Sequence, residues 1–112
     1  MRAYYQQNKE RFLEELYSIL RIPSISALEE NKPDMQRCAQ ALAELLKEAG
    51  AERAEVFPTT GHPVVYGERI IDPKLKTVLI YGHYDVQPVD PIELWKSAPF
   101  EPEIRDGAIY AR

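Results

Sequence analysis

The 112-residue sequence has almost no cysteine, no long apolar run and no excess of basic charge. A single cysteine, Cys38, excludes a disulfide framework and a cysteine-rich zinc site within the chain. The net charge of -4 argues against a nucleic-acid or anionic-membrane partner, because both need a basic face. No apolar stretch reaches the ~20 residues of a membrane helix, and residues 1–10 lack the apolar core of a signal peptide. We therefore expect a cytoplasmic protein.

Several familiar catalytic motifs are missing as well. The sequence has no Gly-rich phosphate loop, no Gly-x-Ser-x-Gly turn and no His-Glu-x-x-His helix motif. What is present is ordinary globular composition, with 45% hydrophobic and 29% charged residues. A chain of this length can form one domain with a modest core.

Two amphipathic helices are predicted in the first half of the chain. Between about residues 4 and 21, apolar residues recur at three- and four-residue spacing, and Pro23 stops the pattern. A second helix is expected from residue 33 to 49, with Asn31 as a plausible cap and Gly50 placed to end it.

Cys38 lies on the apolar stripe of the second predicted helix. The stripe consists of Met35, Cys38, Ala39, Leu42, Leu45, Leu46 and Ala49. A small buried core residue is therefore a better interpretation of Cys38 than a reactive thiol.

The second half of the chain has the pattern of strands. Residues 54–57 and 64–68 are expected to be short strands, and Asp106-Gly107 predicts a turn before a further strand from residue 108. Residues 77–81 form a continuous apolar run that is typical of a central strand covered on both faces. Helices followed by such strands predict helices packed on a sheet, in the α/β or α+β class.

His83 and Asp85 directly follow the predicted central strand and are candidates for chemistry. Ligands of open α/β folds lie at the carboxyl ends of strands. In an extended chain, residues two apart face the same way, so His83 could bind a metal while Asp85 supports it, with Tyr84 facing away. From the spacing alone, a local hydrogen bond is favoured over a metal ligand, and His62 is expected to have a structural or solvent-facing role.

Residues 76–88, Lys-Thr-Val-Leu-Ile-Tyr-Gly-His-Tyr-Asp-Val-Gln-Pro, closely resemble the first metal motif of the dinuclear-zinc family of aminoacylases, carboxypeptidases and dipeptidases. The Tyr between His and Asp, and the Val-Gln-Pro that follows, resemble the dipeptidase (carnosinase-like) branch. Further similarities occur in order along nearly the whole chain, at residues 20–26, 61–68, 90–91, 94–95, 99–102 and 107–112.

The resemblance implies a role for each residue of the motif. His83 would ligate one zinc, and Asp85 would be the carboxylate that orients it and supports catalysis. The expected fold is the amino-terminal part of a three-layer α/β/α zinc-peptidase catalytic domain, with residues 1–112 lacking the rest of that domain and the dimerisation domain. The other metal ligands and the general base would lie outside this chain.

The same resemblance implies hydrolysis of dipeptides or small peptides by water activated between two zinc ions. The complete enzyme would be a homodimer, and the 112-residue chain alone is expected to be inactive and at best a weak metal binder. Two alternatives remain open. One is a deacylase of N-acyl amino acids from the same family, and the other is a non-catalytic, self-associating module derived from it.

Overall fold

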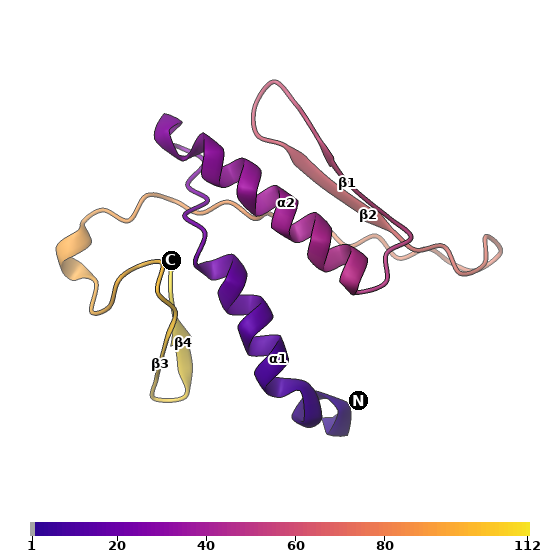
Figure 1. Cartoon of the computed structure of the whole chain (residues 1–112), viewed down its shortest axis with the longest axis horizontal. Helices are drawn as coiled ribbons and strands as arrows, with labels where there is room; N and C mark the ends of the chain where they lie inside the picture. Colours follow the sequence, from indigo (N-terminus) through magenta and orange to yellow (C-terminus); the bar gives the residue numbers. More distant parts are fainter. Residues whose placement is uncertain (1) are drawn as a thin grey trace.

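The computed structural model describes residues 2–112 as two α-helices followed by two separate β-hairpins (Figure 1). The elements, in chain order, are α1 (Arg2–Leu20), the 3-10 helix η1 (Glu29–Asn31), α2 (Lys32–Glu48), β1 (Arg53–Phe57), β2 (Val64–Glu68), the 3-10 helix η2 (Ile92–Leu94), β3 (Glu103–Arg105) and β4 (Ala108–Tyr110). Both predicted helices and the two predicted short strands after Gly50 are therefore confirmed to within two residues at each end.

The ends of α2 follow from local chemistry. Asn31 occupies the cap position, as predicted, but its side chain makes no capping bond to the helix backbone. Its amide nitrogen instead donates to the carbonyl oxygen of Pro23 at 3.1 Å and to the carboxylate of Asp34 at 2.9 Å. At the other end, Gly50 has a φ of 97°, a left-handed conformation that glycine adopts without steric cost. Asn31 thus ties the start of α2 to the chain that leaves α1.

The core lies between α2 and the β1–β2 hairpin. The two strands pair antiparallel, with Val56 opposite Val65, and α2 contacts both. The buried apolar side chains are those of Ile25, Met35, Cys38, Ala39, Ala43 and Ala54. Cys38 is 0% exposed, so the prediction of a buried core residue is confirmed. Burial raises the pKa of its thiol, which makes it a poor nucleophile at neutral pH.

The prediction of a central strand at residues 77–81 is wrong for this structure. The segment has no β pairing, and the side chains of Val78, Leu79, Ile80 and Tyr81 are 81–90% exposed. No backbone hydrogen bond joins residues 77–82 to another described segment. A strand needs neighbours on its edges, and within residues 2–112 the four strands are already paired as two hairpins. Residues 77–81 have the apolar pattern of a strand, but none of the described strands pairs with them.

The last part of the chain is a loop closed by a small hairpin. As predicted, Asp106 and Gly107 form the turn of β3–β4, with φ values of 49° and 77°. The indole nitrogen of Trp95 donates to the carbonyl oxygen of Val89 at 2.8 Å, which folds the proline-rich loop back on itself. The guanidinium of Arg112 donates to the carbonyl oxygen of Gln87 at 2.9 Å, so the end of the described chain contacts the loop that follows Asp85.

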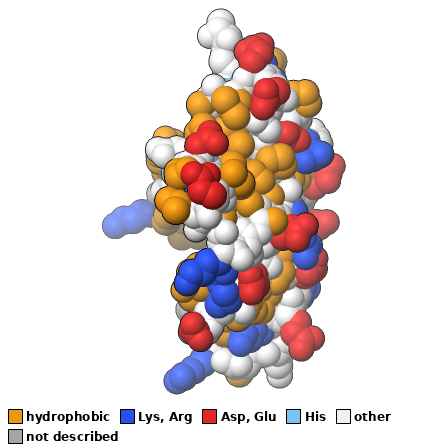
Figure 2. Space-filling view, turned by 90° about the vertical axis from the view of Figure 1, so that its left-hand side faces the viewer, with side chains coloured by type: hydrophobic (Ala, Val, Ile, Leu, Met, Phe, Trp, Pro, Cys, Tyr) orange, Lys and Arg blue, Asp and Glu red, His pale blue; other side chains and the backbone are white. Residues whose placement is uncertain are grey.

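The molecule is flat and open. Its principal extents are 53 × 42 × 19 Å, and its radius of gyration is 16.3 Å, where a compact chain of this length would have about 13 Å. Apolar side chains reach the surface over much of the face shown in Figure 2, between charged residues. No helix within residues 2–112 is long and apolar enough to cross a membrane. The open shape agrees with a core that one helix and one hairpin share.

Candidate metal site

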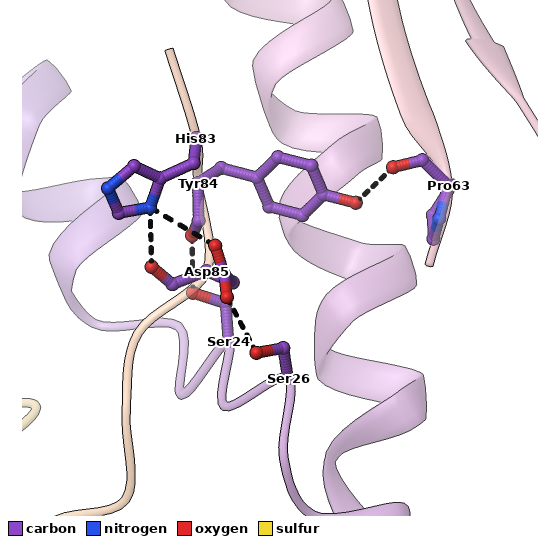
Figure 3. Close-up of polar contacts among 6 residues, drawn as sticks. All are labelled: Ser24, Ser26, Pro63, His83, Tyr84 and Asp85. Carbon is purple, nitrogen blue, oxygen red and sulfur yellow. Dashed lines mark hydrogen bonds and ion pairs between the residues drawn. The ribbon is translucent and has the colours of Figure 1, made fainter. Parts of the chain in front are cut away.

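The predicted site residues lie where two distant segments meet. The segment after α1, residues 24–26, runs parallel to residues 84–86 and forms an isolated β-bridge between Ile25 and Val86. The amide of Val86 donates to the carbonyl oxygen of Ser24 at 2.9 Å. The hydroxyl of Ser24 donates to the carbonyl oxygen of Tyr84 at 2.8 Å, as Figure 3 shows. Residues about 60 positions apart are thereby held side by side.

His83 and Asp85 face each other, and Tyr84 points the opposite way (Figure 3). The Nδ1 atom of His83 lies 3.1 Å from Oδ1 of Asp85 and 3.1 Å from the backbone oxygen of Asp85. The other ring nitrogen, Nε2, points away from both, and the His83 side chain is 78% exposed. Since both neighbours of Nδ1 are acceptors, the proton belongs on Nδ1 and the lone pair on Nε2. This is the tautomer that can offer Nε2 to a metal.

The carboxylate of Asp85 is held at both oxygens. While Oδ1 faces His83, Oδ2 accepts a hydrogen bond of 2.6 Å from the hydroxyl of Ser26. This bond from Ser26 is the largest cause of a lowered pKa at Asp85, with a smaller contribution from His83 and an opposing one from partial burial. Asp85 is therefore an ionised acceptor at neutral pH.

Tyr84 anchors the loop on its other side. Its hydroxyl donates to the carbonyl oxygen of Pro63 at 2.5 Å, beside the start of β2, and the ring is half-buried. Burial is the main cause of a raised pKa at Tyr84, so its hydroxyl stays protonated and can keep donating. The loop that carries His83 is thus fixed from two directions.

His62, the other histidine, has a structural contact. Its Nε2 lies 2.8 Å from the carbonyl oxygen of Ser26, and the side chain is half-buried.

Within residues 2–112, no group of three or more His, Cys, Asp or Glu side chains could hold a metal ion. A hollow of about 460 Å³ lies between η2 and the β3–β4 hairpin, and neither His83 nor Asp85 lines it. Nε2 of His83 therefore fits one ligand of a zinc site, and the carboxylate of Asp85 fits the group that supports that ligand. The described residues do not supply the other ligands of such a site.

The sequence did not point to Ser26, and no role was expected for residues 24–26. Its partner Asp85 is 59 positions away, and no periodicity or spacing links two positions at that distance. The only available signal was the similarity of residues 20–26 to the same family, which singled out the segment without assigning it a function.

The chain is similar in sequence to a metallodipeptidase and to desuccinylases. No family model matches the chain. It is 36% identical over 107 residues to the Cys-Gly metallodipeptidase DUG1 of Candida albicans, a match that covers 85% of this chain and 22% of that protein. It is 40% identical over 82 residues to a succinyl-diaminopimelate desuccinylase of Paraburkholderia xenovorans, covering 71% of this chain and 21% of that protein.

Two solved structures share the fold. The dipeptidase Dug1p of Saccharomyces cerevisiae superposes with a TM-score of 0.80 at 28% identity, over 90% of this chain and 23% of that one. An M20 family metallo-carboxypeptidase of Sulfolobus solfataricus superposes with a TM-score of 0.79 at 48% identity, over 89% of this chain and 22% of that one.

In sequence and in fold, the chain therefore resembles a segment of metal-dependent peptidases. More particularly, the chain is related to the M20 metallopeptidases and their desuccinylase relatives, and it spans about a fifth of the length of the curated relatives that it matches. This confirms the resemblance seen at residues 76–88 and the predicted fold class, a fragment of an α/β peptidase domain. The roles of individual residues stay predictions.

Proposed function

We propose that this chain is the first part of the catalytic domain of a zinc-dependent peptidase that hydrolyses dipeptides or small peptides. His83 is one zinc ligand through Nε2, and Asp85 orients it. The observation that supports this most directly is the contact of His83 Nδ1 with Asp85, which leaves Nε2 free and exposed. Two bound zinc ions would supply an activated water and polarise the scissile carbonyl.

The residues of this chain supply only part of that chemistry. A catalytic zinc takes three protein ligands, whereas His83 brings one nitrogen and Asp85 one supporting carboxylate. The remaining ligands, the general base and the homodimer interface would come from the rest of a longer enzyme, which works in the cytoplasm. We therefore propose that residues 1–112 alone do not hydrolyse peptides.

Dipeptides are favoured over N-acyl amino acids for two reasons. Residues 84–88, Tyr-Asp-Val-Gln-Pro, resemble the dipeptidase branch, and two of the relatives are named as dipeptidases. Deacylation remains the second candidate, because succinyl-diaminopimelate desuccinylases match at up to 40% identity.

Zinc titration of the 112-residue chain, followed by NMR of the two histidine rings, tests the metal role directly. We expect weak binding that perturbs His83 and disappears in His83→Ala. His62→Ala is the matched control, because Nε2 of His62 already contacts the carbonyl oxygen of Ser26. Zinc binding that survives His83→Ala unchanged would refute the assignment.

A chimera tests the role in catalysis. Residues 1–112 would replace the corresponding segment of the Sulfolobus carboxypeptidase, which is 48% identical and has the same fold. Removing a group that hydrogen-bonds a metal ligand typically lowers metal affinity or activity by ~10–100-fold. Removing the ligand itself, in the His83→Ala chimera, should therefore lower kcat/KM by at least ~100-fold. The His62→Ala chimera, which loses only a contact with the backbone of Ser26, should lose far less activity. Chelator-sensitive dipeptide hydrolysis by residues 1–112 alone would contradict the proposal that this chain is inactive.

A further inference from the structure

The segment after α1 contacts the loop of the candidate metal site through both its backbone and its side chains. Ser24 and Ile25 are buried, and their backbone and the Ser24 hydroxyl bind Tyr84 and Val86. These contacts fix where the backbone of the loop lies. They do not set the side-chain rotamer of Asp85, which needs a partner of its own.

Ser26 is that partner. Its hydroxyl donates to Oδ2 of Asp85 at 2.6 Å, within the range of a strong hydrogen bond to an ionised acceptor. The backbone of Ser26 is itself held, because Nε2 of His62 lies 2.8 Å from its carbonyl oxygen. A hydroxyl on a fixed backbone can direct a carboxylate that is otherwise 40% exposed and free to turn.

The contacts form a continuous chain that ends at the metal-facing nitrogen. Ser26 binds one oxygen of Asp85, the other oxygen of Asp85 faces Nδ1 of His83, and Nε2 of His83 points outward (Figure 3). An acceptor at Nδ1 selects the tautomer with its proton there. Without the Ser26 hydroxyl, Nδ1 would keep only the backbone oxygen of Asp85 as a reliable acceptor.

We propose that Ser26 is a positioning residue: its hydroxyl fixes the carboxylate of Asp85, which in turn holds His83 in the tautomer that presents Nε2. The importance of that tautomer for metal binding depends on the function proposed above. The geometric claim does not, since it concerns only this chain without metal.

NMR of the metal-free 112-residue chain, with ¹⁵N-labelled histidine and at a pH where imidazole is neutral, reports the tautomer of His83 from its two ring nitrogen shifts. In the wild type we expect the Nδ1-protonated form to dominate. In Ser26→Ala, the ratio of that form to the Nε2-protonated form should fall threefold or more, on the order expected for losing a charge-assisted hydrogen bond at a half-exposed site. Ser26→Thr, which keeps the hydroxyl, should retain the wild-type ratio.

Ser24→Ala is the matched control, because its hydroxyl binds the backbone of Tyr84 and not the carboxylate. An unchanged tautomer ratio in folded Ser26→Ala would overturn the proposal. An equal fall in Ser24→Ala would also overturn it, since the backbone contact would then be responsible. If Ser26→Ala does not fold, Ser26→Cys keeps the volume, offers only a weak donor and should show the same fall.

Zinc titration of the same variants separates this inference from the proposed function. If Ser26→Ala shifts the tautomer and lowers zinc affinity 10–100-fold, both are supported. If the tautomer shifts and zinc binds neither protein through His83, the positioning role stands and the metal role fails. If zinc affinity falls with no shift in tautomer, Ser26 acts by another route and the inference fails.

Discussion

Two apolar segments of this chain have opposite environments. On α2, the side chains of Met35 and Cys38 are 2% and 0% exposed, whereas Leu79 and Ile80 in the 77–81 segment are almost fully exposed. Both segments have the composition of a protein interior. The difference shows that an apolar pattern indicates a need for burial, but burial requires a partner within reach. The helix finds its partner a few residues downstream, and the 77–81 segment has none among the described residues.

Hydrogen exchange should show the largest difference between the two segments. Amides in the centre of α2 are protected by helical bonds and by the core, whereas those of residues 77–81 have no backbone hydrogen bond to another segment. We expect the α2 amides to exchange at least ~100-fold more slowly, which corresponds to about 2.8 kcal/mol of local opening free energy. Equal protection of the two segments would mean that residues 77–81 pair in solution, with another copy or another segment.

Alanine substitution should sharpen the comparison at the level of single side chains. Met35→Ala removes a buried side chain and should lower the free energy of unfolding by ~2–5 kcal/mol. Leu79→Ala removes a side chain that contacts mainly water, and should change it by no more than ~0.5 kcal/mol. Urea denaturation followed by circular dichroism measures both. A large cost for Leu79→Ala would reveal burial that the structure does not contain.

The smallest effect is expected at alkaline pH. Burial raises the pKa of Cys38 above its usual value, so the unfolded chain releases the thiol proton at a lower pH than the folded chain does. Above the ordinary thiol pKa of ~8.5, the unfolded state binds fewer protons, and the free energy of unfolding must fall as the pH rises. Tyr84, whose pKa burial also raises, contributes with the same sign.

Cys38→Ala removes one of these two contributions. Urea unfolding between pH 8 and 10 should therefore give a shallower decline in the variant than in the wild type. Identical declines would show that the Cys38 thiol ionises as readily in the folded chain as in the unfolded one, and that the α2 core is open to water.

The elements that were predicted correctly from the sequence depend on interactions between near neighbours. Helical periodicity placed α1 and α2, Gly50 marked the end of α2, and Asp106-Gly107 marked the turn of β3–β4. Each of these signals depends on residues within one or two turns of each other. The sequence also placed Cys38 on the buried face, because only one stripe of an amphipathic helix can face a core.

Only part of the candidate site could be predicted from the sequence. Adjacent positions on an extended chain put His83 and Asp85 on one face with Tyr84 on the other, and the structure has that arrangement. The hydroxyl of Ser26 could not be inferred, because its contact with Asp85 spans 59 positions. Such contacts depend on how the whole chain folds.

The sequence by itself thus determined the two helices, the first two strands, the buried side of α2 and the resemblance to the M20 metallopeptidases. Only the tertiary structure decided which apolar segments are covered and which side chain holds Asp85. The physical reason is range: propensity, periodicity and turn chemistry act between near neighbours, whereas strand pairing and the contacts of a site depend on segments that meet only in the folded chain.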